Sequence, residues 1–210
     1  VKHCAAGKFR NAGQVCISPT RFFIEEPVYD EFIKSFKSHV EAINVGDGLD
    51  SKSTMGPLVA DRRLEVMEDF ISDAVSSGGE VISGGGRGQS PGSFFEPTLI
   101  RDVPDTAKIM IEEPFGPVAP SASFSSIDEI IERANSLPFG LASYAFTSNP
   151  RTSQILKSEI ESGMLAINSM HIHSVETPFG GLKHSGYGYE GSIEGLEAFL
   201  VTKYSSEIYT

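Results

Sequence analysis

Hydrophobic positions in the first half of the chain follow the three- and four-residue spacing of amphipathic helices in two places. The first place begins at Pro27, a residue suited to the first turn of a helix, and the second ends at Gly78, where a glycine can close a helix. Aromatic and β-branched residues before Pro27 predict a buried strand. In chain order, we expect a helix over residues 1–14, a strand over 20–24, and helices over 27–40 and 64–74.

In the rest of the chain, short apolar runs alternate with amphipathic stretches. We predict strands over residues 94–100, 118–124, 144–147 and 163–168 and helices over 127–134, 150–161 and 193–200. Such alternation is typical of parallel strands joined by helical crossovers. The predicted fold class is therefore α/β, with a largely parallel sheet and helices on both of its faces.

The glycine-rich stretch 83–92 has the composition of a phosphate-binding loop. A dinucleotide loop of this kind has to lead into the N-terminus of a helix, whereas this stretch leads into the strand predicted over residues 94–100. We therefore interpret it as a connector between strands.

The chain has 210 residues, of which 40% are hydrophobic, which suffices for one domain with a buried core. We expect this domain to span residues 1–201. Residues 202–210 alternate in polarity like a strand, with no obvious partner in the chain. Because the chain opens at Val1 inside a helix-like pattern, we also expect it to be a piece of a longer protein.

The net charge of −11 argues against nucleic acid or an anionic membrane as a partner. No apolar run approaches the roughly 20 residues of a membrane-spanning helix. The start of the chain lacks the charged-then-apolar pattern of a signal peptide, and the two cysteines, Cys4 and Cys16, form no disulfide framework. These observations favour a cytoplasmic protein.

Cys16 is the leading candidate for chemistry. It follows the predicted first helix and precedes the turn-forming Ser18 and Pro19. A thiol at such a break meets backbone N–H groups and little steric cover, so an electrophile can approach it. The alternative is a buried structural cysteine, which is the commoner use of a lone thiol.

Three motifs occur in a fixed order along the chain. They are Phe-x-Asn-x-Gly-Gln-x-Cys over residues 9–16, Glu-Pro-Phe-Gly-Pro over 113–117, and Pro-Phe-Gly-Gly over 178–181, the last followed by Ser185 and Gly186. In this order the sequence resembles the catalytic domain of the aldehyde dehydrogenase superfamily, over essentially the whole chain.

The resemblance implies oxidation of a small aldehyde to a carboxylic acid with NAD or NADP. Cys16 would be the nucleophile, and its own backbone N–H one donor to the oxyanion. Glu113 would hold the nicotinamide ribose, with Phe115 beside the nicotinamide ring. The family's general base, its second oxyanion donor and most of its cofactor-binding surface belong to a preceding domain that these residues do not include.

The resemblance also indicates a substrate. Arg10 and Ser174 match the positions that bind the distal carboxylate in succinate semialdehyde dehydrogenases, and a guanidinium suits that role. Phe179 and His173 would line the substrate entrance. One departure is Ser18, because many of these enzymes have there a second cysteine that forms a redox switch with the nucleophile.

Other interpretations remain open. His171 and His173 suggest metal binding, but no third ligand is recognisable, so we predict no metal site. A dehydrogenase for another small aldehyde, a thiol hydrolase without cofactor and a non-catalytic relative are the alternatives. In the resembled family a C-terminal strand pairs across a subunit contact, which implies a homodimer or homotetramer.

Overall fold

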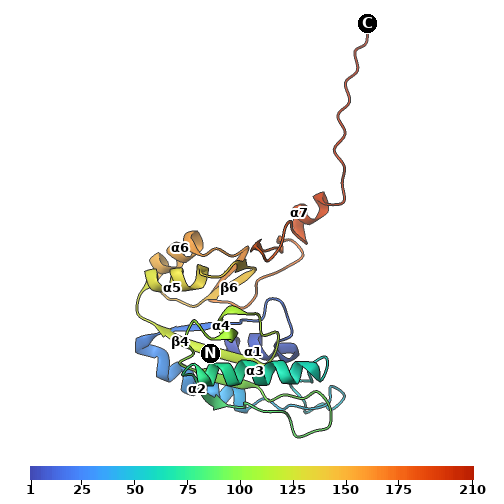
Figure 1. Cartoon of the computed structure of the whole chain (residues 1–210). Helices are drawn as coiled ribbons and strands as arrows, with labels where there is room; N and C mark the ends of the chain where they lie inside the picture. Colours follow the sequence, from blue (N-terminus) through green and yellow to red (C-terminus); the bar gives the residue numbers. More distant parts are fainter.

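The computed structural model describes residues 1–210, which form an α/β fold (Figure 1). The α-helices are α1 (Lys2–Phe9), α2 (Tyr29–Glu41), α3 (Arg62–Ser76), α4 (Lys108–Ile111), α5 (Ile127–Asn135), α6 (Pro150–Glu159) and α7 (Ser192–Glu197). The strands are β1 (Phe22–Glu25), β2 (Glu80–Ser83), β3 (Thr98–Arg101), β4 (Val118–Phe124), β5 (Phe139–Gly140), β6 (Ala142–Ala145), β7 (Met164–Ile167) and β8 (Leu182–Lys183). Two 3₁₀ turns, η1 (Arg10–Gly13) and η2 (Glu26–Val28), complete the elements.

The main sheet has four strands in the order β1-β4-β3-β2. Strand β4 is parallel to both of its neighbours, whereas β2 is antiparallel to β3 at the edge. The prediction of an α/β fold with a largely parallel sheet is therefore confirmed. The glycine-rich stretch does connect two strands, but its first strand, β2, was not predicted because four residues between Gly79 and Gly84 are too short to show a pattern.

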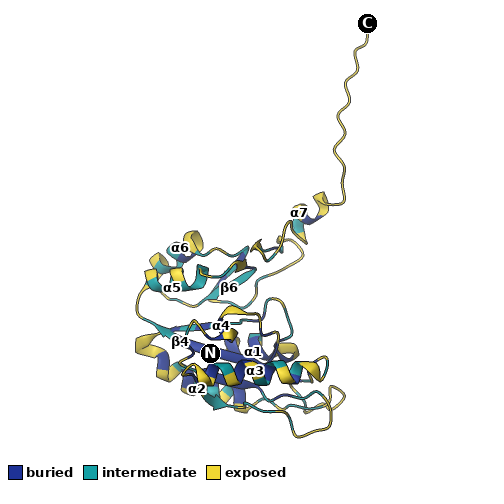
Figure 2. Cartoon of the chain, in the orientation of Figure 1, coloured by how far each residue is buried: buried dark blue, intermediate teal, exposed yellow.

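A single apolar cluster joins the main sheet to helices α1, α2 and α3. Helix α2 buries Ile33, Phe36 and Val40, and α3 buries a stripe at the same spacing, which confirms both predicted amphipathic helices. The Phe36 ring contacts Phe22 of β1 edge-on, with ring centroids 5.1 Å apart, and lies 6.3 Å from the ring of Phe9. Figure 2 shows this buried region around α1, α2, α3 and β4. The end of α1 is thereby fixed to the sheet.

Helix α1 ends at Phe9, five residues before the predicted end of the helix at residue 14. Asn11 and Ala12 have left-handed backbones, with φ of 51° and 53°, so a right-handed helix cannot continue through them. Two hydrogen bonds hold this conformation: the Asn11 amide donates to the carbonyl of Gln14, and the Gln14 N–H donates to the carbonyl of Asn11. Asparagine tolerates the left-handed region better than most residues do.

The strands after α5 form small sheets of their own, in which β6 pairs in parallel with β7 and β5 pairs with β8. The strand predicted over residues 144–147 therefore lies two residues too far along. It ends at Ala145 because the N–H and the carbonyl of Thr147 both bond to the side-chain amide of Asn168, at 2.8 Å each. Figure 1 shows α5, α6 and β6 together on one side of the main sheet.

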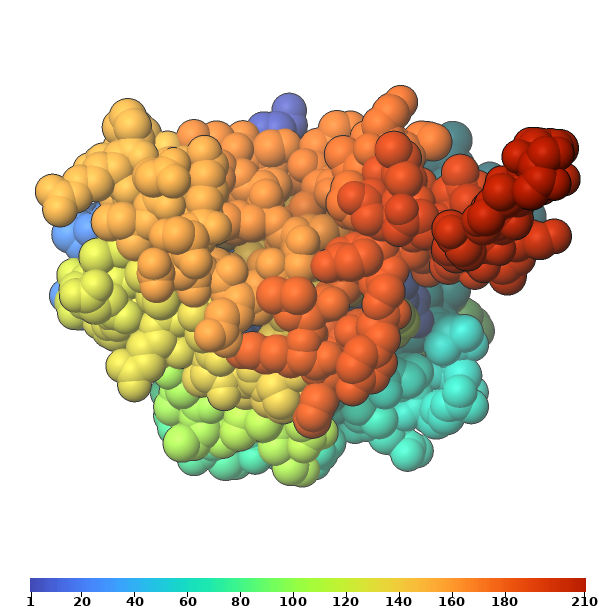
Figure 3. All heavy atoms as spheres, turned by 90° about the horizontal axis from the view of Figure 1, so that it is seen from above, coloured from blue at the N-terminus to red at the C-terminus, as the bar shows by residue number.

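The last helix and the tail leave the body of the molecule. Helix α7 is shorter than the predicted 193–200, and residues 201–210 are extended and exposed, with no strand pairing within the chain. Figure 3 shows the second half of the chain covering one face of the molecule and the tail projecting beyond its edge. No helix combines the length and the apolar character needed to cross a membrane.

Candidate active site

Cys16 lies on an exposed turn directly after η1, and its thiol is free. The Ser18 N–H closes the turn by donating to the carbonyl of Val15 at 2.8 Å. The buried Ser18 hydroxyl donates to the carbonyl of Lys8 at 3.1 Å, so the residue that replaces the expected second cysteine ties the turn back to α1. The Cys16 backbone N–H has no hydrogen-bond acceptor within the chain. The turn thus presents a thiol and a free backbone donor together.

Gln14 fixes the Cys16 turn against a second segment of the chain. Its side-chain oxygen accepts from the Val59 N–H at 2.9 Å, and its amide nitrogen donates to the carbonyl of Pro57 at 3.3 Å. Asn11 and Gln14 therefore build the turn with their side chains, which these hydrogen bonds occupy.

The Cys16 turn and the Glu113–Phe115 turn (residues 113–117) meet at two glycines, Gly13 and Gly116. A Cβ added to Gly13 would lie 2.1 Å from the carbonyl oxygen of Gly116, and Gly13 has a φ of +71°. Both facts require glycine at this position. The structure therefore brings the predicted nucleophile and the predicted cofactor residues together through a backbone contact.

Glu113 and Phe115 both lie at the surface of their turn. Glu113 is exposed, and the Phe115 ring is 38% exposed although its neighbours Pro114 and Gly116 are buried. Phe115 has a φ of 42°, which is unusual for an aromatic residue. The turn therefore holds a carboxylate and an aromatic ring in solvent on a constrained backbone.

Lys8, on α1, has an environment that the sequence does not reveal, since a lysine in a helix ordinarily faces solvent. It is fully buried, and its ammonium nitrogen has no hydrogen-bond partner. Burial lowers the pKa of Lys8 to about 7, and the negative charge of Glu113 opposes this shift. Lys8 thus lies within the electrostatic reach of the predicted cofactor carboxylate.

Tyr144, on β6, contacts the Cys16 turn, which its place in an apolar strand pattern does not reveal. Its hydroxyl donates to the carbonyl of Ile17 at 2.9 Å. Burial raises the pKa of Tyr144 to about 12, while the charge of Arg10 lowers it and that of Cys16 raises it. Tyr144 therefore lies close enough to both groups to feel their charges, and it connects β6 to the Cys16 turn.

Arg10 is exposed, six residues before Cys16, and forms no ion pair within the chain. Ser174 lies in the exposed loop between β7 and β8, where its N–H donates to the Thr177 hydroxyl at 2.8 Å. A hydrogen bond from Ser174 lowers the pKa of the Glu176 carboxyl. No hydrogen bond joins Arg10 to Ser174, so the structure does not bring these two predicted substrate residues into one contact.

Aromatic rings organise the same loop. The His173 ring lies edge-on to Phe179, with centroids 6.1 Å apart, and 6.4 Å from the ring of His171. No group of three or more His, Cys, Asp or Glu side chains converges to hold a metal ion in the structure. The loop thus carries a small cluster of edge-on aromatic rings next to Ser174.

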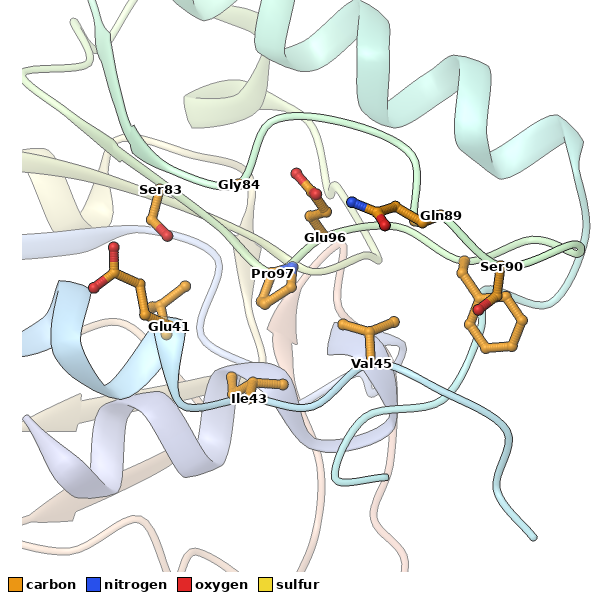
Figure 4. Close-up of a pocket in the computed structure, with 12 residues that line it drawn as sticks. Glu41, Ile43, Val45, Ser83, Gly84, Gln89, Ser90, Glu96 and Pro97 are labelled. Atoms are coloured by element: carbon orange, nitrogen blue, oxygen red, sulfur yellow. The ribbon is translucent and has the colours of Figure 1, made fainter. Parts of the chain in front are cut away.

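An open pocket of about 450 Å³ lies elsewhere, between the end of α2 and the connector from β2 to β3. Figure 4 shows Glu41 from α2 and Gln89 and Glu96 from the connector around it. None of the predicted site residues lines this pocket. We therefore assign the candidate site to the Cys16 turn and not to this pocket.

The site thus combines an exposed thiol and a free backbone donor with a carboxylate and an aromatic ring on the adjoining turn, which are features that a cysteine nucleophile requires. Residues 1–205 match the model of the aldehyde dehydrogenase family. The chain belongs to this family.

Relatives with established names have different substrates. The chain is 43% identical to 4-(hydroxymethyl)benzenesulfonate dehydrogenase of Comamonas testosteroni over 94% of its own length and 41% of the relative. It is 39% identical to the NADP⁺-dependent succinate-semialdehyde dehydrogenase of Escherichia coli over 97% of its length and 42% of the relative. The crystal structure of succinate-semialdehyde dehydrogenase from Burkholderia pseudomallei superposes with a TM-score of 0.93 at 37% identity, covering 95% of this chain and 42% of that one.

The chain therefore spans about two fifths of the length of the curated relatives it matches. The family assignment and the α/β fold hold for the matched residues.

Proposed function

We propose that the protein containing this chain oxidises an aldehyde to a carboxylic acid with NAD(P)⁺, and that its substrate is succinate semialdehyde. The observation that carries the proposal is the free, exposed Cys16 on a turn braced against the Glu113–Phe115 turn at Gly13 and Gly116. A mobile or buried thiol would not suit this chemistry, since the nucleophile and the hydride acceptor have to keep a fixed relation.

The residues of the second turn fit a nicotinamide cofactor. An exposed carboxylate such as Glu113 can accept hydrogen bonds from two ribose hydroxyls, and the half-exposed Phe115 ring can lie against a flat heterocycle. When bound, NAD(P)⁺ supplies the acceptor for the hydride that leaves the substrate. The name of the E. coli relative specifies NADP⁺, and the choice between NAD⁺ and NADP⁺ for this protein stays open.

The Cys16 turn can carry the covalent steps. The Cys16 sulfur attacks the aldehyde carbon, and the free Cys16 N–H donates to the oxygen that becomes negatively charged. After loss of hydride, the acyl group stays on sulfur as a thioester, which water cleaves to release the acid and restore the thiol. The water-activating base and a second oxyanion donor are proposed to come from outside these 210 residues, so we expect the 210 residues alone to be inactive.

Arg10 supports succinate semialdehyde as the substrate. Its guanidinium is exposed and unpaired, and Tyr144 lies within the electrostatic reach of both Arg10 and Cys16. A substrate with a carboxylate at the far end from its aldehyde can bridge the two residues. We propose that Ser174, Phe179 and His173 form the opposite wall of the substrate site.

Arg10→Ala tests this substrate in the full-length protein. Loss of a charge-assisted contact costs roughly 2–5 kcal/mol, so kcat/KM for succinate semialdehyde should fall at least about 30-fold. Kinetics with butanal, which has the same carbon count but no carboxylate, provide the control and should change less than about threefold. An equal loss on both aldehydes would show that the substrate is a different one.

A second candidate is an aromatic sulfonated aldehyde. The C. testosteroni relative is named for a benzenesulfonate, whose anion could also pair with Arg10 and whose ring could lie on the rings of His173 and Phe179. Comparing kcat/KM for 4-formylbenzenesulfonate and succinate semialdehyde distinguishes the two. A thiol hydrolase, the alternative from another class, would turn over a thioester or ester without NAD(P)⁺ and form no reduced cofactor.

We further propose a homodimer or homotetramer joined through residues 202–210, and a reducing compartment such as the cytoplasm. The first is supported by the exposed apolar and aromatic side chains of the tail, among them Tyr204, Ile208 and Tyr209. The second is supported by the two free thiols, Cys4 and Cys16.

A further inference from the structure

Side chains of helix α3 contact the Glu113–Phe115 turn. Arg63, in the first turn of α3, donates from Nη2 to the carbonyl oxygen of Pro114 at 2.5 Å and to that of Phe115 at 3.5 Å. Arg63 forms no ion pair, so both hydrogen bonds of its guanidinium go to this turn. A charged donor on two successive carbonyls fixes the orientation of the peptide between them.

That peptide needs to be fixed. Phe115 has a left-handed backbone, with φ of 42°, which costs an aromatic residue conformational energy and persists only when surrounding contacts maintain it. The same backbone conformation sets where the Phe115 ring points, and Glu113 lies two residues earlier on the same turn. Arg63 therefore acts on the backbone on which both predicted cofactor contacts are mounted.

Three further contacts along α3 hold the same part of the chain. Met67, one turn after Arg63, lies so close to Gly116 that a Cβ there would be 2.2 Å from its sulfur. Asp69 pairs with the Lys108 ammonium at 2.8 Å, and Asp73 accepts from the Lys108 N–H at 2.7 Å, which anchors α4 just before Glu113. Helix α3 thus supports the segment from α4 to Gly116 along its length.

We propose that Arg63 is a positioning residue that sets the Glu113–Phe115 turn for the nicotinamide end of the cofactor. This inference rests on the proposed function, since it takes Glu113 and Phe115 as cofactor contacts. Arg63 touches neither substrate nor reacting atoms; it acts through the carbonyls of Pro114 and Phe115. Its removal should therefore weaken cofactor binding and leave aldehyde binding nearly unchanged.

The test uses the full-length protein with Arg63→Ala, Arg63→Lys and the matched control Arg62→Ala. Arg62 is the adjacent residue on α3, is exposed, and its side chain forms no hydrogen bond or ion pair. For Arg63→Ala we expect KM and Kd for NAD(P)⁺ to rise about 10- to 100-fold, because a charged donor is lost. Arg63→Lys keeps one charged donor and should lose less, and Arg62→Ala should match the wild type. KM for the aldehyde should stay within about twofold in all three.

Methylguanidinium provides a readout that a general loss of stability would not give. Added to Arg63→Ala, it should restore part of the cofactor affinity by occupying the guanidinium position, and it should have no effect on Arg62→Ala. A folded Arg63→Ala protein whose Kd for NAD(P)⁺ equals that of the wild type would overturn the inference. So would a parallel rise of both KM values without rescue, since that pattern indicates general destabilisation.

A failure of the proposed function would give a different experimental result. In that case the wild-type protein itself would show no NAD(P)⁺-dependent aldehyde oxidation and no binding of NAD(P)⁺. If the wild type is active and binds the cofactor while the Arg63 variants behave as it does, only the role of Arg63 is wrong.

Discussion

At the scale of single residues, Lys8 has the least favourable environment in the molecule. Its ammonium is fully buried without a hydrogen-bond partner, and its pKa falls from 10.5 to about 7 in the folded protein. At a pH between these two values, Lys8 has lost its proton in the folded chain and still binds it in the unfolded chain. The free energy of unfolding should therefore rise with pH from about 7 to 10.5. Below pH 7 the buried charge should lower the free energy of unfolding by its full cost.

Replacing Lys8 by methionine should remove this cost. We expect Lys8→Met to raise the free energy of unfolding by on the order of 3 kcal/mol at pH 6, and the gain should disappear as the pH approaches 10.5. Urea denaturation at pH 6, 8 and 10 measures it. Lys2→Met, an exposed lysine at the start of the same helix, should change little at any pH. A gain in the free energy of unfolding that does not change with pH would show that the pKa of Lys8 is not lowered in the folded protein, as it would be if the ammonium had a hydrogen-bond partner.

At the scale of elements, the contact between the Cys16 turn and the Glu113–Phe115 turn is the most sensitive to a small change. Gly13→Ala would place a methyl group 2.1 Å from the Gly116 carbonyl oxygen on a backbone with φ of +71°. We expect it to destabilise the protein by more than about 2 kcal/mol and to abolish most aldehyde oxidation. Thermal unfolding and kcat measure the two effects.

Gly48→Ala is the matched control, because nothing lies within 4 Å of a Cβ at that position. It should leave Tm and kcat close to those of the wild type. Should Gly13→Ala behave like Gly48→Ala, the two turns would not be in contact in solution.

Elements were predictable from the sequence where packing imposed a regular pattern on at least two helical turns or on a buried run of residues. The amphipathic stripes of α2 and α3 and the apolar strand β4 are examples. The end of α1 was not predictable, because side-chain hydrogen bonds from Asn11 decide it. For the site, Cys16, Glu113 and Phe115 followed from motifs, whereas Lys8, Arg63 and Tyr144 depend on contacts between distant segments.

At the scale of the whole molecule, residues 201–210 are exposed over their entire length and include several large apolar side chains. Such a segment gains stability only when another surface covers it. Ending the full-length protein at Leu200 should therefore lower its assembly to monomers or dimers, as measured by light scattering after size-exclusion chromatography. An unchanged molecular mass would show that the tail has no part in assembly.

The glycine contact between the two turns has a consequence for how such an enzyme can diversify. Gly13 and Gly116 meet through backbone atoms, so the spacing between the thiol and the Glu113–Phe115 turn does not depend on the side chains proposed to recognise the substrate. Arg10 and the loop that carries Ser174 lie outside this contact and can vary independently. Under the proposed function, new aldehydes would be accommodated by changing these recognition groups while the spacing between the two turns is kept.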